Sequence, residues 1–265
     1  MYEFAYAKPA SVADAVSLLK ADADAKPVSG GMTLVPTMKQ RLARPTQLVD
    51  LSGIAGLKGV KVEGAKVTIG AMTRHAEVAH SKELAKAIPA LAKLAEGIGD
   101  PAVRNRGTIG GSVANNDPTA DYPSAVLALG GTVVTDRRRI SADDFFQGMF
   151  TTALEPGELI TAIEFPVPEK AAYAKFPNPA SRYAMVGVFV AKGSAGVRVA
   201  VTGAGQGGVF RHKAMETALA ASWSPDAVAK VATPAADLNG DIHASPEYRA
   251  HLVGVMAKRA VAAAG

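Results

Sequence analysis

Hydrophobic and polar residues follow two different periods in the first 165 residues. Apolar positions at helical spacing predict helices over residues 11–20, 33–42, 75–95 (with Pro89 as an interruption) and 120–129. Alternation of apolar and polar positions predicts strands over 27–29, 47–51 and 159–165, and hairpins over 60–69 and 132–140. Strands mixed with helices, without regular alternation, favour an α+β fold over a doubly wound sheet.

The last hundred residues have a separate pattern. Strand-like apolar segments come first, at 184–191 and 197–201, and alanine-rich helices follow at 211–221, 225–232 and 246–263. The Pro-containing, charged stretch Pro166–Lys170 lies between the two patterns. We therefore predict one domain over residues 1–167, with subdomains of about 1–56 and 57–167, and a second domain over 168–265.

Charge is spread thinly along the chain. Of its 265 residues 48% are hydrophobic and 20% are charged, and the net charge is +5. The one basic run, Arg137–Arg139, is typical of a solvated hairpin turn. No nucleic-acid recognition motif accompanies this run, so we expect no nucleic-acid partner.

The chain contains no cysteine. Disulfides, thiolate nucleophiles and iron–sulfur clusters ligated by this chain are therefore excluded. The first sixteen residues lack the cationic start and apolar core of a signal peptide, and no apolar run approaches the ~18 residues that cross a bilayer. These features predict a cytoplasmic protein without a membrane span, and they leave peripheral membrane contact open.

Candidate chemistry gathers in two glycine-rich segments. The longer one, Gly99–Asp121, reads GDPAVRNRGTIGGSVANNDPTAD. Gly-Gly allows backbone to approach a ligand closely, and consecutive backbone N–H groups form anion-binding concavities. Two such cradles predict a bound diphosphate, and hence a dinucleotide. The proposed donors are Ser29, Gly30, Gly31, Met32 and Thr33 in the first cradle, and Thr108, Ile109, Gly110, Gly111 and Ser112 in the second. A branched side chain at Gly110 is expected to obstruct the ligand.

Two further motifs receive structural interpretations. Residues 203–208, GAGQGG, match the GxGxxG fingerprint, but no second strand with a ribose-binding acid follows, so a tight glycine turn is favoured. The five histidines show no metal-ligand spacing, and we predict no metal site.

Arg104 and Arg106 flank the second cradle. They either neutralise phosphate or, as we favour, hold the loop to neighbours such as Asp100.

Three longer stretches resemble a known family. SGGMTLVPTMKQRLARPTQLVDL, IGDPAVRNRGTIGGSVANNDPTADYPSAVLALG and DFFQGMFTTALEPGELITAIEFP are similar to the FAD-binding medium subunits of molybdenum hydroxylases, among them carbon monoxide dehydrogenase. DLNGDIHASPEYRAHLVGVMAKRAV resembles the C-terminal helical segment of the same family. The likeness covers nearly the whole chain.

The resemblance implies a fold and a function. The expected fold is a two-subdomain, PCMH-like FAD-binding domain, followed by a small α+β flavoprotein domain with a three-stranded sheet and helices. FAD in this chain is expected to take electrons from [2Fe-2S] clusters of a small subunit and to pass them to an external acceptor. Substrate oxidation belongs to a large molybdopterin subunit, and the expected assembly is a dimer of heterotrimers.

The resemblance also implies roles for single residues. Lys175 and Tyr183 lie in motifs that relatives place near the flavin ring, so Lys175 is expected to favour negative charge on the reduced ring and Tyr183 to cover one face. Ile160 is at most a backbone or packing contact. Asp121 is expected to accept a hydrogen bond from a flavin hydroxyl; the alternative is an N-cap for the following helix.

The sequence departs from the family pattern at three places. Met32 stands where relatives more often carry a polar residue, Ser29 replaces a commoner alanine, and Asn178–Arg182 precedes Tyr183 where glycine and an acid are common. The alternatives that stay open are a stand-alone FAD-dependent oxidoreductase and a flavin-free scaffold of the same fold. The substrate and the electron acceptor are not readable from the chain.

Overall fold

The computed structural model describes all 265 residues, and its first part is a small parallel sheet with one helix packed on it. The sheet order is β1-β3-β2. Helix α1 begins where the Ser11 hydroxyl accepts a hydrogen bond from the amide of Asp14 at 3.1 Å, and it buries Ala15, Val16 and Leu19 against the sheet. The elements are β1 (Ala5–Ala7), α1 (Val12–Ala21), β2 (Lys26–Val28), α2 (Leu34–Lys39) and β3 (Gln47–Asp50), followed by 3-10 turns η1 (Leu51–Gly53) and η2 (Ala55–Leu57).

The second part is a five-stranded antiparallel sheet of order β4-β5-β10-β6-β7, with helices packed on it. The largest core of the chain lies here; its 29 buried residues include Phe189, Ala191 and Ala200 of the C-terminal sheet. The strands are β4 (Val60–Glu63), β5 (Lys66–Gly70), β6 (Thr132–Thr135), β7 (Arg139–Ser141) and β10 (Ile160–Pro166). The other elements are α3 (His75–His80), α4 (Lys82–Ala87), α5 (Pro89–Glu96), α6 (Pro101–Arg104), α7 (Ile109–Asn115), α8 (Tyr122–Ala128), α9 (Ala142–Phe145), β8 (Phe146–Gly148) and β9 (Thr151–Thr152).

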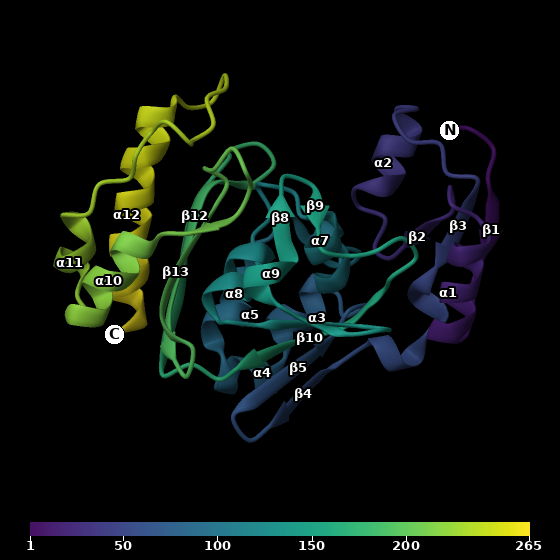
Figure 1. Cartoon of the computed structure of the whole chain (residues 1–265), viewed down its shortest axis with the longest axis horizontal. Helices are drawn as coiled ribbons and strands as arrows, with labels where there is room; N and C mark the ends of the chain where they lie inside the picture. Colours follow the sequence, from purple (N-terminus) through teal and green to yellow (C-terminus); the bar gives the residue numbers. More distant parts are fainter.

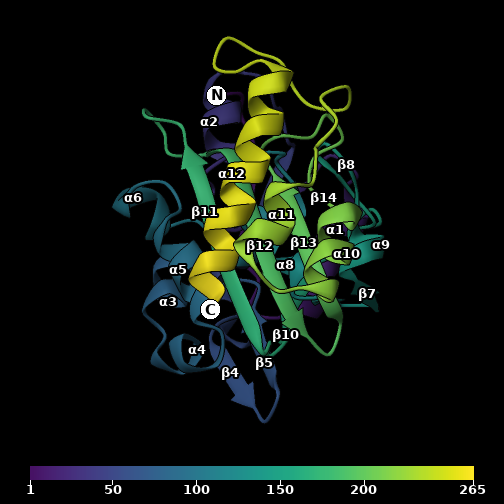
Figure 2. The same cartoon turned by 90° about the vertical axis from the view of Figure 1, so that its left-hand side faces the viewer.

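The third part is an antiparallel sheet of order β11-β12-β13-β14 with three helices. Helix α12 lies across one face of this sheet (Figure 2), and α5 and α8 contact its other face (Figure 1). Strand β12 is therefore buried on both sides, which explains its unbroken apolar run from residue 184 to 191. The elements are β11 (Lys170–Pro177), β12 (Ala184–Gly193), β13 (Gly196–Thr202), β14 (Phe210–Arg211), α10 (Lys213–Ala221), α11 (Pro225–Ala229) and α12 (Pro246–Ala264).

The α+β class is confirmed, and several details differ from the expectation. The C-terminal sheet has a fourth strand of two residues, β14, beside the expected three. The helix predicted over 75–95 is three helices, because Ser81 caps α4 through its hydroxyl and Pro89 begins α5. The glycine-rich segment, predicted as loop, contains α6 and α7. Residues 203–208 form a turn, in which the N–H of Gly203 donates to the carbonyl of Pro118.

The three arginines of the basic run are all paired. Arg137 contacts Glu155, Arg138 contacts Glu158, and Arg139 contacts Glu164. The run therefore holds its hairpin to the neighbouring strand and loop instead of forming a free cationic patch. No helix of the chain is both long enough and apolar enough to cross a bilayer.

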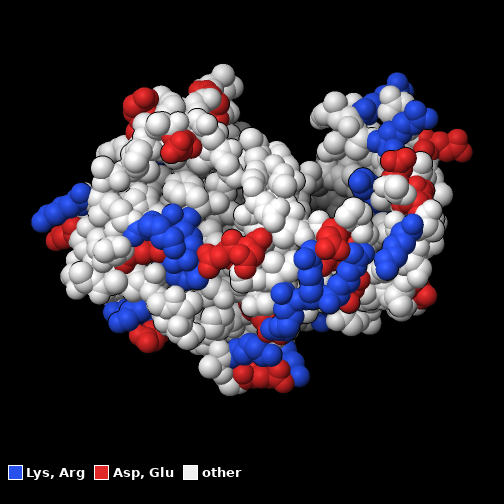
Figure 3. All heavy atoms as spheres, in the orientation of Figure 1, with Lys and Arg blue, Asp and Glu red and all other residues white.

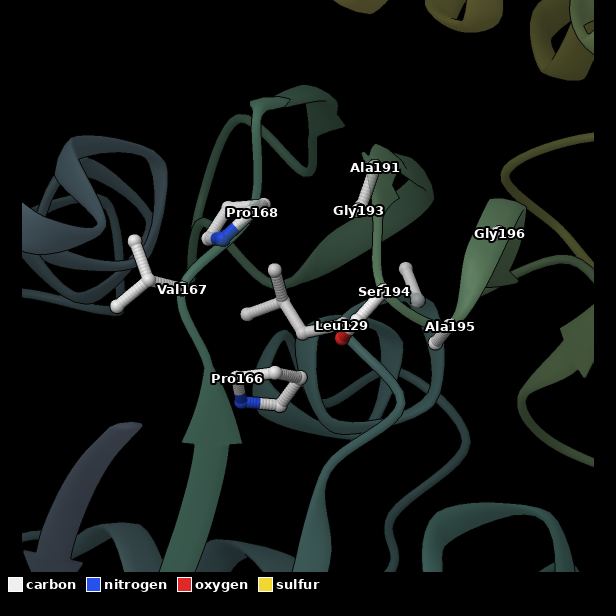
Figure 4. Close-up of a pocket in the computed structure, with 10 residues that line it drawn as sticks. Leu129, Pro166, Val167, Pro168, Ala191, Gly193, Ser194, Ala195 and Gly196 are labelled. Carbon is white, nitrogen blue, oxygen red and sulfur yellow. The ribbon is translucent and has the colours of Figure 1, made fainter. Parts of the chain in front are cut away.

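A short linker joins the second and third parts. Pro166, Val167 and Pro168 run beside Leu129 and the Ser194–Ala195 turn (Figure 4). The space enclosed there measures about 10 Å³, which is hardly room for one water molecule. The Thr202 hydroxyl adds hydrogen bonds to the carbonyls of Pro118 and Ala120 at 3.1 and 2.7 Å, so the C-terminal sheet is tightly packed on the helices of the second part.

Arg249 fixes α12 to the end of the C-terminal sheet. Its side chain is only 3% exposed, and it donates to the carbonyls of Met185 and Gly203 and to the carboxylate of Asp241. Replacement by methionine keeps most of the packing but leaves two carbonyls without donors.

We predict that Arg249→Met lowers the free energy of unfolding by about 2–4 kcal/mol. The matched control is Arg259→Met on an exposed position of the same helix, which should change it by less than about 0.5 kcal/mol. Denaturant unfolding followed by circular dichroism measures both. Equal stabilities of the two variants would contradict this function of Arg249.

Candidate cofactor site

A cavity of about 710 Å³ is lined by residues from all three parts of the chain. The surface is hollowed between the lobe that carries α2 and the rest of the molecule (Figure 3). The lining comes from the loop between β2 and α2, from the glycine-rich segment, and from residues 154–160 and 181–183. Cavities of this size hold cofactors and drug-sized ligands.

The first glycine loop presents a run of unpaired backbone donors to this cavity. The N–H groups of all residues from Ser29 to Leu34 have no acceptor within the chain, and all six residues line the cavity. Gly31 has φ +72°, a conformation that costs glycine little. Thr33 precedes α2 without a side-chain cap. Consecutive free amides of this kind form an anion-binding concavity.

The second glycine segment differs from the prediction, because its amides are already used. The N–H groups of Ile109 and Gly110 donate to the carbonyls of Thr73 and Ala71, at 3.1 and 2.9 Å. Those of Gly111 and Ser112 donate to Thr108, the N-cap of α7. In the stretch 108–112 only the Thr108 amide has no acceptor in the chain. The prediction that all five backbone amides of this segment are available to a ligand is therefore wrong.

The two segments are nevertheless in direct contact. A Cβ on Gly30 would lie 2.3 Å from the carbonyl oxygen of Arg106 and 2.7 Å from the Cα of Gly107. The Ser29 hydroxyl lies 2.5 Å from that of Thr108 and donates to the sulfur of Met72 at 3.0 Å. The first loop therefore packs on the second segment, and the hydrogen bond between Ser29 and Thr108 joins the two.

Asp121 also lines the cavity, where α8 meets the C-terminal sheet. The Tyr173 hydroxyl donates to its carboxylate at 2.6 Å, and Lys175 Nζ lies 3.0 Å from Oδ1. Burial raises the pKa of Asp121, although both partners act in the opposite direction. Asp121 occupies the N-cap position of α8, as the alternative predicted, but its side chain makes no cap hydrogen bond, so its carboxylate does not cap the helix.

Of the remaining predicted residues, some line the cavity and others do not. Tyr183 and Ile160 line the cavity. Lys175 is not in the lining, and its ammonium also donates to the carbonyls of Gly97 and Arg182, at 2.8 and 3.0 Å. Ile109 is fully buried in the core and does not reach the cavity. Met32 is 39% exposed at the cavity wall.

Two family models match this chain, and together they cover nearly all of it. Residues 2–168 match the FAD binding domain in molybdopterin dehydrogenase, and residues 171–264 match the CO dehydrogenase flavoprotein C-terminal domain. The chain belongs to the FAD-binding medium subunits of the molybdenum hydroxylases.

Three proteins of this family are similar to the chain over nearly its whole length. The nicotine 6-hydroxylase medium subunit of Paenarthrobacter nicotinovorans is 37% identical over 98% of this chain and 96% of its own. The carbon monoxide dehydrogenase medium chain of Afipia carboxidovorans is also 37% identical, over 97% and 95%. The structure of reconstituted CO dehydrogenase from Oligotropha carboxidovorans superposes with a TM-score of 0.90 at 35% identity, covering 99% and 98%.

The residues of this family member fit FAD. Six free amides on one loop match the doubly charged pyrophosphate. The same cavity is lined by that loop and by Asp121 and Tyr183, and its 710 Å³ is in the range of cofactor sites. No cluster of metal-ligating side chains accompanies it.

Sequence reasoning missed His75 as a cavity residue and treated it only as a poor metal ligand. The side chain is 4% exposed and lines the cavity beside Gly107. Burial, together with the nearby Arg104 guanidinium, lowers the pKa of His75 to about 4. Arg104 itself donates to the carbonyls of Ile98 and Gly99 at 2.9 and 3.0 Å, so it holds the loop as predicted but through carbonyls instead of Asp100.

The reason for glycine at position 110 is also different from the prediction. A Cβ there would lie 2.5 Å from the Cβ of Ala71 and 2.7 Å from its carbonyl oxygen. The constraint is therefore the packing of α7 on the residue after β5, and not the approach of a ligand. We predict that Gly110→Ala lowers the unfolding free energy by about 1–3 kcal/mol through overpacking.

The matched control for Gly110→Ala is Gly207→Ala, since a Cβ at residue 207 meets nothing within 4 Å. This control should be neutral or slightly stabilising. Thermal unfolding of both variants without added FAD makes the comparison. An unchanged melting temperature for Gly110→Ala would show that the contact with Ala71 relaxes at no cost.

The lowered pKa of His75 predicts a pH dependence of stability. In the unfolded chain the imidazole takes up its proton near pH 6.5, whereas in the fold it does so only near pH 4. The unfolded state is therefore favoured increasingly as pH falls from about 6.5 to 4, by about 3 kcal/mol in total. The test compares the unfolding free energies of His75→Gln and of the original chain between pH 6.5 and 4. The original chain should lose stability as pH falls, and the variant should lack the part of this loss that His75 causes. Parallel profiles of the two proteins would contradict this prediction.

Proposed function

We propose that this chain is the FAD-carrying electron-transfer subunit of a molybdenum-dependent hydroxylase or dehydrogenase complex. It would receive electrons from the [2Fe-2S] clusters of a small subunit and deliver them to an external acceptor. Substrate oxidation would take place on a large molybdopterin subunit. The proposed assembly is a dimer of heterotrimers, and the proposed domain limits are 1–167 and 168–265.

The observation that carries the proposal is the run of free amides from Ser29 to Leu34 at the wall of a 710 Å³ cavity. These residues are half-buried or exposed, so their amides are open to a ligand that enters the cavity, and consecutive amides of this kind form a concavity that attracts an anion. The FAD pyrophosphate supplies acceptor oxygens with negative charge, and hydrogen bonds to charged groups contribute about 1.5–3 kcal/mol each. The Ser29–Thr108 contact keeps this loop in place on the second segment.

A second part of the cavity, formed with residues of the C-terminal domain, suits the flavin ring. Tyr183 lines it, held by a hydrogen bond from the Asn178 side chain to its hydroxyl at 3.1 Å. The Asp121–Lys175 pair places an ammonium group and a carboxylate at the boundary between the domains. When bound, FAD supplies the redox chemistry, and the chain positions and tunes it. Lys175 is proposed to favour negative charge there, and Asp121 to orient Lys175 and to face a cofactor hydroxyl.

The proposed electron path requires partner subunits. The chain has no cysteine and no cluster of metal-ligating residues, so iron–sulfur and molybdenum centres must be held by other chains. Similar chains are named as medium subunits or FAD subunits of complexes that act on nicotine, carbon monoxide, glyceraldehyde and nicotinate. The substrate named for the complex therefore varies among relatives of this chain, and we place its oxidation on the large subunit.

The test is purification of the complex through a tag on this chain. We predict one FAD per chain, absorbance near ~450 nm and co-purification of a molybdopterin protein and an iron–sulfur protein. A panel of carbon monoxide, aldehydes and N-heterocycles identifies a substrate. After reversible removal of FAD, substrate should still reduce the iron–sulfur clusters, while reduction of the external acceptor should stop.

Each rival has its own outcome in this experiment. A chain that is isolated alone and reduces its flavin directly with small molecules would favour the stand-alone oxidoreductase. A colourless chain that cannot be reconstituted with FAD would favour the flavin-free scaffold. Acceptor reduction that persists without FAD would contradict the proposed electron path.

A further inference from the structure

His75 lies between the two glycine segments and the core of the second part of the chain. It is the first residue of α3, and its backbone N–H donates to the carbonyl of Gly107 at 2.9 Å. A Cβ on Gly107 would lie 2.5 Å from His75 Nε2. The imidazole therefore fills the space that a side chain at residue 107 would take. Glycine at 107 is required by this ring.

Neither ring nitrogen of His75 has a hydrogen-bond partner in the chain. Nδ1 is completely enclosed and unpaired, as is the hydroxyl of Tyr122, whose ring centroid lies 5.3 Å from that of His75. Nε2 differs from Nδ1, because it is not completely enclosed and His75 lines the cavity. An unpaired polar side chain that is 96% buried is unusual, and here one of its two nitrogens can reach a bound molecule.

Burial determines the charge and the tautomer of this ring. The lowered pKa of His75 keeps the imidazole neutral at pH 7. A proton on Nδ1 would be an enclosed donor without an acceptor, which proteins avoid more strictly than an unpaired acceptor. The proton therefore belongs on Nε2, where it can be donated into the cavity.

The position of Gly107 indicates which part of a cofactor lies there. Gly30, in the loop with six free amides, packs directly against the Arg106–Gly107 backbone, and His75 packs against Gly107 from the side where its Cβ would stand. The next residue, Thr108, carries the one amide of residues 108–112 that has no acceptor in the chain. The imidazole thus stands next to the donors that suit the pyrophosphate.

We propose that His75 donates a hydrogen bond from Nε2 to a phosphoryl oxygen of the FAD pyrophosphate, and so makes the site selective for the dinucleotide. This inference rests on the proposed binding of FAD. The first loop supplies backbone donors and His75 supplies a neutral side-chain donor. Selectivity follows because riboflavin, which lacks phosphate, cannot accept this hydrogen bond.

The test uses two substitutions in the full chain, purified with its co-purifying subunits and freed of FAD. His75→Met removes the donor and keeps much of the volume, whereas His75→Gln keeps an N–H donor near the position of Nε2. Flavin fluorescence titration should show Kd for FAD raised about 10- to 100-fold in His75→Met and within about threefold of the original in His75→Gln. Kd for riboflavin should be the same in all three proteins.

Three outcomes would overturn the proposal. Unchanged FAD affinity in His75→Met would exclude the hydrogen bond. An equal loss of riboflavin affinity would place the contact at the ring instead of the phosphate. A loss of FAD affinity of equal size in His75→Gln, with a lowered melting temperature, would show that the residue acts only through packing.

A measurement on the unsubstituted protein keeps the proposal testable if the variants fail to fold. With ¹⁵N-labelled histidine, NMR should report an Nε2–H tautomer for His75, and the Nε2 signal should shift on addition of FAD but not of riboflavin. An Nδ1–H tautomer, or no shift with FAD, would contradict the proposal. Failure of the unsubstituted protein to bind FAD would instead contradict the proposed function itself.

Discussion

The close contact between Gly30 and the Arg106–Gly107 backbone is the constraint on which the cofactor site depends. A single methyl group at residue 30 would collide with the carbonyl of Arg106. This contact brings a loop of the N-terminal part onto the segment that begins α7 in the second part. The amides of residues 109–112 in the second segment donate to Ala71, Thr73 and Thr108. The second segment therefore supports the first loop, whose own amides have no acceptor in the chain and are available to a ligand.

A second set of contacts holds Asp121, another residue of the cavity wall, in place. Asp121, Tyr173 and Lys175 form a buried polar cluster between α8 and β11, and Thr202 holds residues 118–120 to β13. A polar network that is well paired fixes one arrangement of the parts that it joins. These contacts hold the C-terminal sheet against the helices of the second part, and all three parts of the chain line the cavity.

The sequence allowed much of this structure to be predicted, and the misses have physical reasons. Periodicity located most helices and strands, because it reports which face of each element is buried. It missed α7, since a Gly-Gly pair has low helix propensity and only the Thr108 cap and the packing on Ala71 make a helix there. The resemblance supplied the family and the cofactor, and the comparisons confirmed both. It could not show that Lys175 lies outside the cavity lining or that Ile109 is buried.

The sequence by itself determined the fold class, the family and the first glycine loop, because these depend on residue type, period and local backbone freedom. Tertiary structure decided which donors stay free and which groups are charged. Whether an amide at Gly110 or at Gly31 faces a ligand depends on an acceptor supplied by a residue far along the chain, and not on the glycine itself. In the same way His75 is a neutral residue of the cavity wall because the fold buries its ring and places Arg104 near it.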